Sequence, residues 1–176
     1  VYTDISERVR MEEALRAMAL RDDLTSLYNR RGFNVLAEQH FKVANREKRR
    51  LILLYGDVDN LKNINDTLGH LEGDQALRMI ARALESTFRK SDIIARIGGD
   101  EFVVLALESE KAHPEELIQR LEKNLQNIKH QDDNSIPVSI SMGWSIYDPD
   151  QPYPLDELLI LADKAMYNRK PGISIP

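Results

Sequence analysis

The segment LILLYGDVD, residues 51–59, decides the fold of this chain. Its first five residues are continuously apolar, and charged residues lie on both sides of that run, at Arg50 and Asp57. A short apolar run bounded in this way is typical of a central β-strand that is buried on both faces. We therefore expect a strand at residues 51–55 that ends in the acidic turn GDVD, residues 56–59.

The segments that surround this strand alternate between helical and strand patterns. Apolar periodicity, a proline at a helix start and a Gly-Gly turn predict helices at 32–47, 74–88, 114–128 and 155–169, and strands at 93–97, 102–107 and 137–147. From residue 51 onward the order is β-α-β-β-α-β, which indicates a ferredoxin-like α/β fold with a central antiparallel sheet flanked by helices.

This topology brings acidic residues together. It places the first and third strands side by side and antiparallel, so that Asp57-Val58-Asp59 at the end of one lies beside Asp100-Glu101 at the start of the other. The sequence therefore predicts four carboxylates at one edge of the sheet.

Four neighbouring carboxylates repel one another unless a cation or protons compensate. Oxygen ligands without nearby cysteine or histidine select Mg²⁺, Mn²⁺ or Ca²⁺. Because Mg²⁺ is usually held by one or two carboxylates and by substrate phosphates, a nucleoside triphosphate is the expected partner. The alternative is a solvated acidic turn, since Asp and Gly are common in turns.

A polar stretch follows the acidic turn and contains Lys62, Asn65, His70 and Asp74. An amide and a carboxylate together can read the edge of guanine, which makes Asn65 and Asp74 candidates for base recognition. Either residue could equally cap a helix, and for Asp74 taken alone the cap is favoured. His70 is isolated from other histidines, so we expect it to pack or cap rather than to bind metal.

Composition excludes several classes of protein. The 176 residues suit one domain with an appendage, and the absence of cysteine excludes thiol enzymes and cysteine-based zinc sites. The net charge of −5 argues against nucleic acid as a partner. No apolar run approaches the length of a bilayer span, so we expect no direct membrane contact from this segment and a cytoplasmic domain, whether or not upstream domains tether it to a membrane.

The first twenty residues form a separate unit in this interpretation. Residues 1–5 resemble the end of a strand, and Ser6 is placed to cap a helix that runs to about Leu20. Met11, Leu15 and Met18 form a narrow apolar seam on that helix. The helix either packs on its own domain or connects to an upstream domain, and we favour the connector. The boundaries are then 1–20 and 21–176.

Residues 98–102, GGDEF, spell the signature of the GGDEF domain, the catalytic domain of diguanylate cyclases. Other motifs of the chain are similar to that family in the same order, namely DxLTxLxNRR at 22–31, DVDNLKxINDxxGHxxGD at 57–74, SISMG at 139–143 and ADxAMY at 162–167. The leading residues 2–8 resemble the tail of a PAS sensor domain that runs into a signalling helix.

The chain departs from the family pattern at several positions. Ser26 and Tyr28 stand where Gly and Pro are more common, and Asn60-Leu61 where Phe is common. After the last helix the family usually continues Lys-x-x-Gly-Arg-Asn, but here Lys170 begins the sequence KPGIS, so the arginine of the phosphate clamp is missing and the spacing is one residue short.

The resemblance implies that two GTP-loaded domains meet as a homodimer and condense GTP into cyclic di-GMP with release of pyrophosphate. It implies Mg²⁺ or Mn²⁺ held by Asp57, the Val58 carbonyl and Asp100, with catalytic roles for Asp100, Glu101 and Lys62. It further implies that GTP is contacted by Asn60, Leu61, Lys62, Asn65, Asp74 and Lys170. The proton of the 3′-hydroxyl goes to Asp100 or Glu101, and the sequence does not separate the two.

Two other functions stay open at this point. The altered tail favours a catalytically silent module that binds GTP or cyclic di-GMP as a sensor. The second is a cyclase that acts on another nucleotide. Asn65 and Asp74 argue against it, because they are candidates for recognition of guanine.

The resemblance also implies product inhibition. Arg89 and Asp92 form an Arg-x-x-Asp pattern, which in this family binds cyclic di-GMP as an inhibitor. The structural alternative is an arginine at a helix end followed by an aspartate turn.

Overall fold

The computed structural model describes residues 2–110 and 112–169. Its helices and strands follow one another as α1 (Tyr2–Met18), α2 (Arg30–Glu47), β1 (Leu51–Val58), α3 (Leu61–Leu68), α4 (His70–Thr87), β2 (Ile93–Arg96), β3 (Glu101–Leu107), α5 (Pro114–Gln131), β4 (Ile140–Tyr147) and α6 (Leu155–Tyr167).

The four strands form one antiparallel sheet in the order β2-β3-β1-β4. At one end of β1, Leu51 pairs with Leu107 and Tyr147, and at the other end Asp57 pairs with Glu101 and Ser141. The predicted ferredoxin-like sheet, with the first and third strands adjacent and antiparallel, is confirmed.

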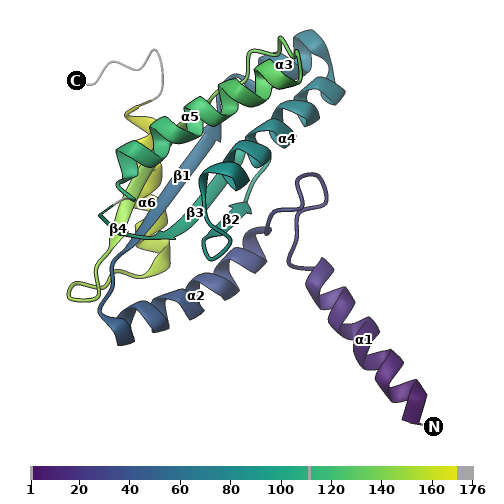
Figure 1. Ribbon diagram of the computed structural model, residues 1–176, viewed down its shortest axis with the longest axis vertical. Coiled ribbons are helices and arrows are strands. Elements are labelled where there is room, and N and C mark those ends of the chain that lie inside the picture. The colour runs from purple at the N-terminus through teal and green to yellow at the C-terminus, as the bar shows by residue number, and fades with distance from the viewer. Residues whose placement is uncertain (1, 111, 170–176) are drawn as a thin grey trace.

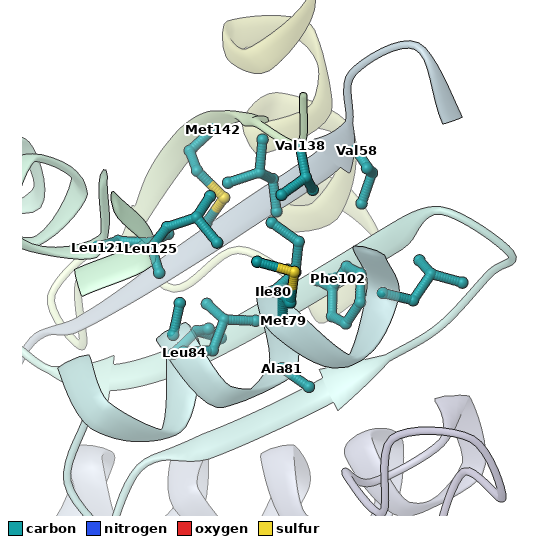
Figure 2. Packing of buried hydrophobic residues seen from close by; sticks show 14 of the residues in the cluster. Val58, Met79, Ile80, Ala81, Leu84, Phe102, Leu121, Leu125, Val138 and Met142 are labelled. Carbon is teal, nitrogen blue, oxygen red and sulfur yellow. The ribbon is translucent and has the colours of Figure 1, made fainter. Parts of the chain in front are cut away.

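Helices cover both faces of the sheet (Figure 1). Ile52, Leu54 and Val58 of β1 belong to the core under α4 and α5, whose other members include Ile80, Leu84, Phe102, Leu121 and Leu125 (Figure 2). The alternate residues Leu51, Leu53 and Tyr55 belong to a second core with α2 and α6, whose members include Phe33, Ala37, Leu158 and Ala162. β1 is therefore buried on both faces, because strand side chains alternate between them.

The polar stretch after β1 is helical, which the sequence did not predict. Asn60 has φ of 55°, a left-handed conformation that turns the chain out of the strand, and α3 begins at the next residue. Only Ile64 of α3 is buried, and one apolar anchor in eight residues leaves no periodic signal. α4 then starts at His70, four residues before the predicted start.

The predicted helix before residue 20 is present as α1, but the strand end predicted at residues 1–5 and the cap at Ser6 were wrong. Residues 2–5 belong to α1, so Ser6 lies inside the helix rather than at its cap, while Val1 lies outside the described residues. Within the described residues no strand pairs with this segment, so its backbone groups bond within a helix.

The apolar seam of α1 does not pack on the domain. Met11, Leu15 and Met18 are 65–69% exposed, and Figure 1 shows α1 extending away from the sheet and its helices. The interpretation in which α1 packs on its own domain is therefore wrong. Among the described residues, the model has no helix with the length and apolar content needed to cross a membrane.

Candidate active site at the edge of the sheet

The C-terminal end of β1 meets the turn between β2 and β3. Asp57 is opposite Glu101 in the strand register, and the Val58 N–H donates to the Asp100 carbonyl oxygen at 2.9 Å. The Oδ1 atom of Asp57 is buried at this edge. Four of the residues predicted for metal binding and catalysis, Asp57, Val58, Asp100 and Glu101, are thus brought together in the way the strand order predicted.

Arg96 holds the turn that carries the GGDEF residues. Its Nη2 and Nε atoms donate to the Gly99 carbonyl oxygen at 2.8 and 3.1 Å, and its Nη1 lies 3.1 Å from Asp22 Oδ1. Asp22 also accepts from the Thr25 hydroxyl and N–H at 2.7 and 2.9 Å. Sequence reasoning assigned no role to Arg96, although an arginine just before a Gly-Gly turn is a detectable signal.

These partners set the ionisation of Asp22. Burial raises the pKa of this carboxyl, but the hydrogen bonds from Thr25 and the positive charge of Arg96 outweigh burial, so the pKa lies below its ordinary value. Asp22 therefore stays ionised, and it ties the turn at residues 22–28 to the GGDEF turn.

Glu101 bends back over the turn that precedes it. A methyl group at Gly98 would come within 2.5 Å of Glu101 Oε2, so the missing side chain at residue 98 makes room for this carboxylate. Tyr55 lies on the same face of the sheet as Glu101, because it is two residues before Asp57, the strand partner of Glu101. Burial, together with the carboxylates of Glu101 and Asp163, raises the pKa of the Tyr55 hydroxyl above its ordinary value, so this group stays protonated.

The Asp59 carboxylate binds two serines instead of joining Asp57, Asp100 and Glu101. Its Oδ1 accepts from the Ser141 hydroxyl at 2.6 Å and its Oδ2 accepts from the Ser139 hydroxyl at 2.7 Å. Sequence reasoning missed both serines as site residues, because they lie 80 and 82 positions from Asp59.

The prediction that four carboxylates converge therefore needs correction. Within residues 2–110 and 112–169, no three or more His, Asp or Glu side chains are grouped so that they could hold a metal. The two serine hydroxyls offer Asp59 hydrogen bonds that relieve the repulsion a fourth carboxylate would add. The smaller predicted set of Asp57, Asp100 and the Val58 carbonyl stays a prediction, and its oxygen donors suit a hard divalent cation.

Two helices carry the residues predicted to contact GTP. Asn60 and Leu61 form the junction between β1 and α3, Lys62 is exposed in the first turn of α3, and Asn65 follows one turn later. The Asn65 amide packs over Gly73 in α4, since a methyl group at Gly73 would overlap its Oδ1. This contact brings Asn65 next to the turn of α4 that contains half-buried Asp74.

The alternative roles for these polar residues are not supported. Neither Asn65 nor Asp74 caps a helix, because Asn60 precedes α3 and Gly69 precedes α4. His70 is exposed as the first residue of α4 and neither packs nor caps. Its expected packed or capping role was wrong, because the turn at Gly69 leaves it in solvent.

The last helix ends near the same edge. A methyl group at Gly143 of β4 would overlap the backbone of Met166 and Ala162, so α6 packs directly on the strand. Just beyond the end of α6, the Arg169 guanidinium lies 3.6 Å from the centre of the Trp144 ring. Lys170 and the altered tail lie outside the described residues.

The Arg-x-x-Asp pattern lies at the opposite end of the sheet. Asp92 lines a cavity together with Leu51 and Leu107. Leu51 lies at the other end of β1 from Asp57, and a rise of about 3.3 Å per residue separates the two by about 20 Å. Asp92 Oδ2 accepts from the Arg89 N–H at 2.8 Å. Burial raises the pKa of Asp92, and hydrogen bonds and the charge of Arg89 offset it only in part.

Cavities adjoin this turn on both sides. One of about 300 Å³ is lined by Arg21, Tyr28, Arg89 and Lys90 among others, and the Arg21 guanidinium stacks 3.8 Å from the Tyr28 ring centre. Another of about 130 Å³ is lined by Arg49, Arg89 and Arg120 among others. Positive side chains therefore surround the Arg89–Asp92 turn, as an anionic ligand requires.

Comparison with known proteins identifies the family. A sequence model described as "Diguanylate cyclase, GGDEF domain" matches residues 19–173. The chain belongs to the GGDEF family. The GGDEF domain of TpbB (YfiN) from Pseudomonas aeruginosa superimposes with a TM-score of 0.71 at 34% identity, covering 85% of this chain and 87% of that one. A coiled coil and GGDEF domain of DgcB from Caulobacter crescentus, solved with c-di-GMP, gives 0.76 at 25% identity over 94% and 88% of the two chains.

Curated GGDEF relatives are considerably longer than this chain. The bifunctional diguanylate cyclase/cyclic di-GMP phosphodiesterase MucR of P. aeruginosa is 37% identical over 92% of this chain and 23% of its own length. The probable diguanylate cyclase DgcC of Escherichia coli is 32% identical over 96% and 45%. NbdA of P. aeruginosa, 36% identical over 89% and 20%, is named a cyclic di-GMP phosphodiesterase. Homology therefore places the GGDEF domain in cyclic di-GMP signalling without fixing its activity.

Proposed function

We propose that this chain is a diguanylate cyclase that condenses two GTP molecules into cyclic di-GMP and releases two pyrophosphates. The observation that carries the proposal is the junction of β1 with the GGDEF turn, where Asp57 is opposite Glu101 and the Val58 N–H bonds to Asp100 at 2.9 Å. In-line phosphoryl transfer needs oxygen ligands for a metal ion and a group that accepts a proton. The residues at this junction are candidates for both tasks.

Each residue of the site has a proposed task. Asp57, the Val58 carbonyl and Asp100 would hold Mg²⁺ or Mn²⁺, which when bound neutralises charge on phosphate oxygens. Lys62 adds positive charge from the first turn of α3. Asp100 or Glu101 accepts the proton of the attacking 3′-hydroxyl.

Recognition of GTP falls to the α3–α4 segment in this proposal. Asn65 and Asp74 read guanine, and the packing of Asn65 over Gly73 supports their acting together. Asn60 and Leu61 line the nucleotide at the start of α3, and Lys170 contacts its phosphates.

Catalysis in this proposal requires two copies of the domain. The 3′-oxygen of one GTP attacks the α-phosphorus of the other, the new P–O bond forms, and the bond to pyrophosphate breaks. Because each domain positions one nucleotide, a C2 dimer completes the reaction twice. In this proposal residues 21–176 form the cyclase domain, and residues 1–20 comprise the end of an upstream PAS-like sensor domain and a connector helix.

Product inhibition is part of the proposal. Arg89 and Asp92 bind cyclic di-GMP, and the basic cavities on either side of their turn support this assignment. Binding there lowers turnover by holding two domains apart, with a coupling free energy of about 1–3 kcal/mol.

A silent sensor is the second candidate function. The tail lacks the usual arginine after Lys170, and Arg169, the preceding cation, is stacked on Trp144. A weakened phosphate clamp favours binding without turnover.

Incubation of the purified chain with GTP and Mg²⁺, followed by mass analysis of the product, separates these candidates. We expect cyclic di-GMP from the wild type and none from Asp57→Asn or Asp100→Ala, with circular dichroism spectra unchanged. GTP binding without product would support the sensor, and near wild-type turnover in either variant would refute the metal assignment.

A further inference from the structure

Asp59 has both carboxylate oxygens engaged by the start of β4. Ser141 and Ser139 donate to Oδ1 and Oδ2 at 2.6 and 2.7 Å, and the Asp59 N–H donates to the Ser139 carbonyl oxygen at 2.9 Å. Ser141 is 8% exposed, so its bond is shielded from water. Three hydrogen bonds therefore join one residue to Ser139, just before β4, and to Ser141 within β4, 80 and 82 positions away in sequence.

The position of Asp59 makes this attachment consequential. Val58, whose carbonyl is a proposed metal ligand, precedes it, and Asn60 follows with φ of 55°. Asn is one of the few residues other than glycine that adopts this left-handed conformation, and it does so as a single residue held by its surroundings. α3 starts immediately afterwards, with Lys62 in its first turn. The contacts that hold Asp59 therefore set the direction of α3, the helix that carries Lys62 and Asn65.

Metal binding makes a different demand on Asp59. A carboxylate ligand to Mg²⁺ acts through its negative charge, whereas the hydrogen bonds from the two serines need only a suitable acceptor or donor atom at each position. A hydroxyl can donate or accept, so an asparagine at residue 59 could accept from one serine and donate to the other. Exchange of Asp59 for Asn thus separates positioning from ligation.

We propose that Asp59 is a positioning residue of the nucleotide site and not a metal ligand, and that Ser139 and Ser141 hold it. The bonds from both serines fix the β1–α3 junction, which aims Lys62 and Asn65 at GTP. This inference rests on the proposed function, because GTP binding at α3 belongs to that proposal.

The test compares Asp59→Asn, Asp59→Ala, the double variant Ser139→Ala/Ser141→Ala and the triple combination of Asp59→Ala with both serine changes. For each we measure GTP affinity by calorimetry with Mg²⁺, steady-state kcat and KM, and the half-saturating Mg²⁺ concentration. We expect Asp59→Asn to stay within about threefold of wild type in all of them. Asp59→Ala and the double serine variant should each weaken GTP binding about tenfold, which corresponds to 1.4 kcal/mol. The triple variant should bind GTP no more weakly than Asp59→Ala or the double serine variant does.

Stability without metal or nucleotide provides a second readout. In EDTA, Asp59→Ala and the double serine variant should lower the melting temperature by a similar amount, roughly 2–6 °C. Ser145→Ala is the matched control, since Ser145 lies on the same strand and the same face of the sheet as Ser141 and donates to the Leu158 carbonyl at 2.8 Å. It should lower the melting temperature and leave GTP affinity unchanged.

Failure takes distinct forms. If Asp59→Asn loses turnover as Asp57→Asn does and needs more Mg²⁺, Asp59 is a ligand and the inference is overturned. Wild-type GTP affinity in the double serine variant overturns it as well. A wild type that binds GTP but makes no cyclic di-GMP defeats the cyclase proposal alone, because the affinities still judge the inference. A wild type that binds no GTP defeats both.

Discussion

Arg96 and Asp22, separated by 74 positions in sequence, form an ion pair in which Arg96 Nη1 lies 3.1 Å from Asp22 Oδ1. The same guanidinium holds the Gly99 carbonyl in the GGDEF turn. The segment before α2 therefore supports the proposed catalytic turn through Arg96.

This pair predicts a pH-dependent contribution to stability. The folded-state pKa of Asp22 lies below its ordinary value of 3.8, so its stabilising contribution is complete above pH 3.8 and is lost as pH falls through the folded-state pKa. Asp22→Asn should destabilise the fold at pH 7 by about 1–2 kcal/mol, because charge-assisted bonds are lost. Urea unfolding from pH 7 down to about pH 2 should show the gap between the two proteins narrowing only below about pH 4. A constant gap would contradict the assigned cause.

Gly143 should tolerate no side chain. Gly143→Ala places a methyl group against the backbone of Met166 and Ala162, which cannot rotate away, and we expect a loss of about 3 kcal/mol or more in unfolding free energy. Gly99→Ala is the control, because a methyl group there has no atom within 4 Å. Equal melting temperatures for the two variants would show that α6 moves aside easily.

Base choice should depend on the α3–α4 segment. Asn65→Ala and Asp74→Ala should each raise the GTP requirement and narrow the preference for GTP over ATP by one to two decades, since an unpaired buried donor costs about 1–3 kcal/mol. The measurement is kcat/KM for both nucleotides. An unchanged GTP-to-ATP ratio in both variants would exclude base reading by these residues.

Product inhibition should depend on Arg89. Arg89→Ala should weaken binding of cyclic di-GMP and let turnover continue to higher product concentrations, because the fork of donors that grips an anion is lost. Its initial rate should change little, since Asp92 and the turn lie about 20 Å along β1 from Asp57. Titration of both proteins with cyclic di-GMP checks this. The same inhibition constant in both would remove the site.

Specific activity should rise with protein concentration. The exposed seam of Met11, Leu15 and Met18 is short, and two heptads or fewer dimerise weakly. A strong parallel zipper joined in phase to the start of α1 should raise activity per molecule at low concentration. Constant specific activity across dilution, for a protein that sediments as a monomer, would contradict the half-site mechanism.

The central sheet and the meeting of Asp57 with Glu101 could be predicted from the sequence alone. A buried strand carries its own apolar signal at residues 51–55, and the β-α-β-β-α-β order leaves few ways to arrange four strands. Because paired strands fix which ends are adjacent, the place of the carboxylates at the sheet edge followed from strand order, without any knowledge of side-chain contacts.

Side-chain partners and the polar helix were decided by tertiary structure. The sequence determined that Asp59 lies at the end of β1, but Ser139 and Ser141, 80 and 82 positions away, determine where its carboxylate points. α3 likewise depends on a left-handed Asn60 and one buried anchor, Ile64. Local patterns report which residues are apolar at a regular spacing, whereas a hydrogen bond between distant polar groups leaves no periodic trace and forms only when the fold brings them within 3 Å.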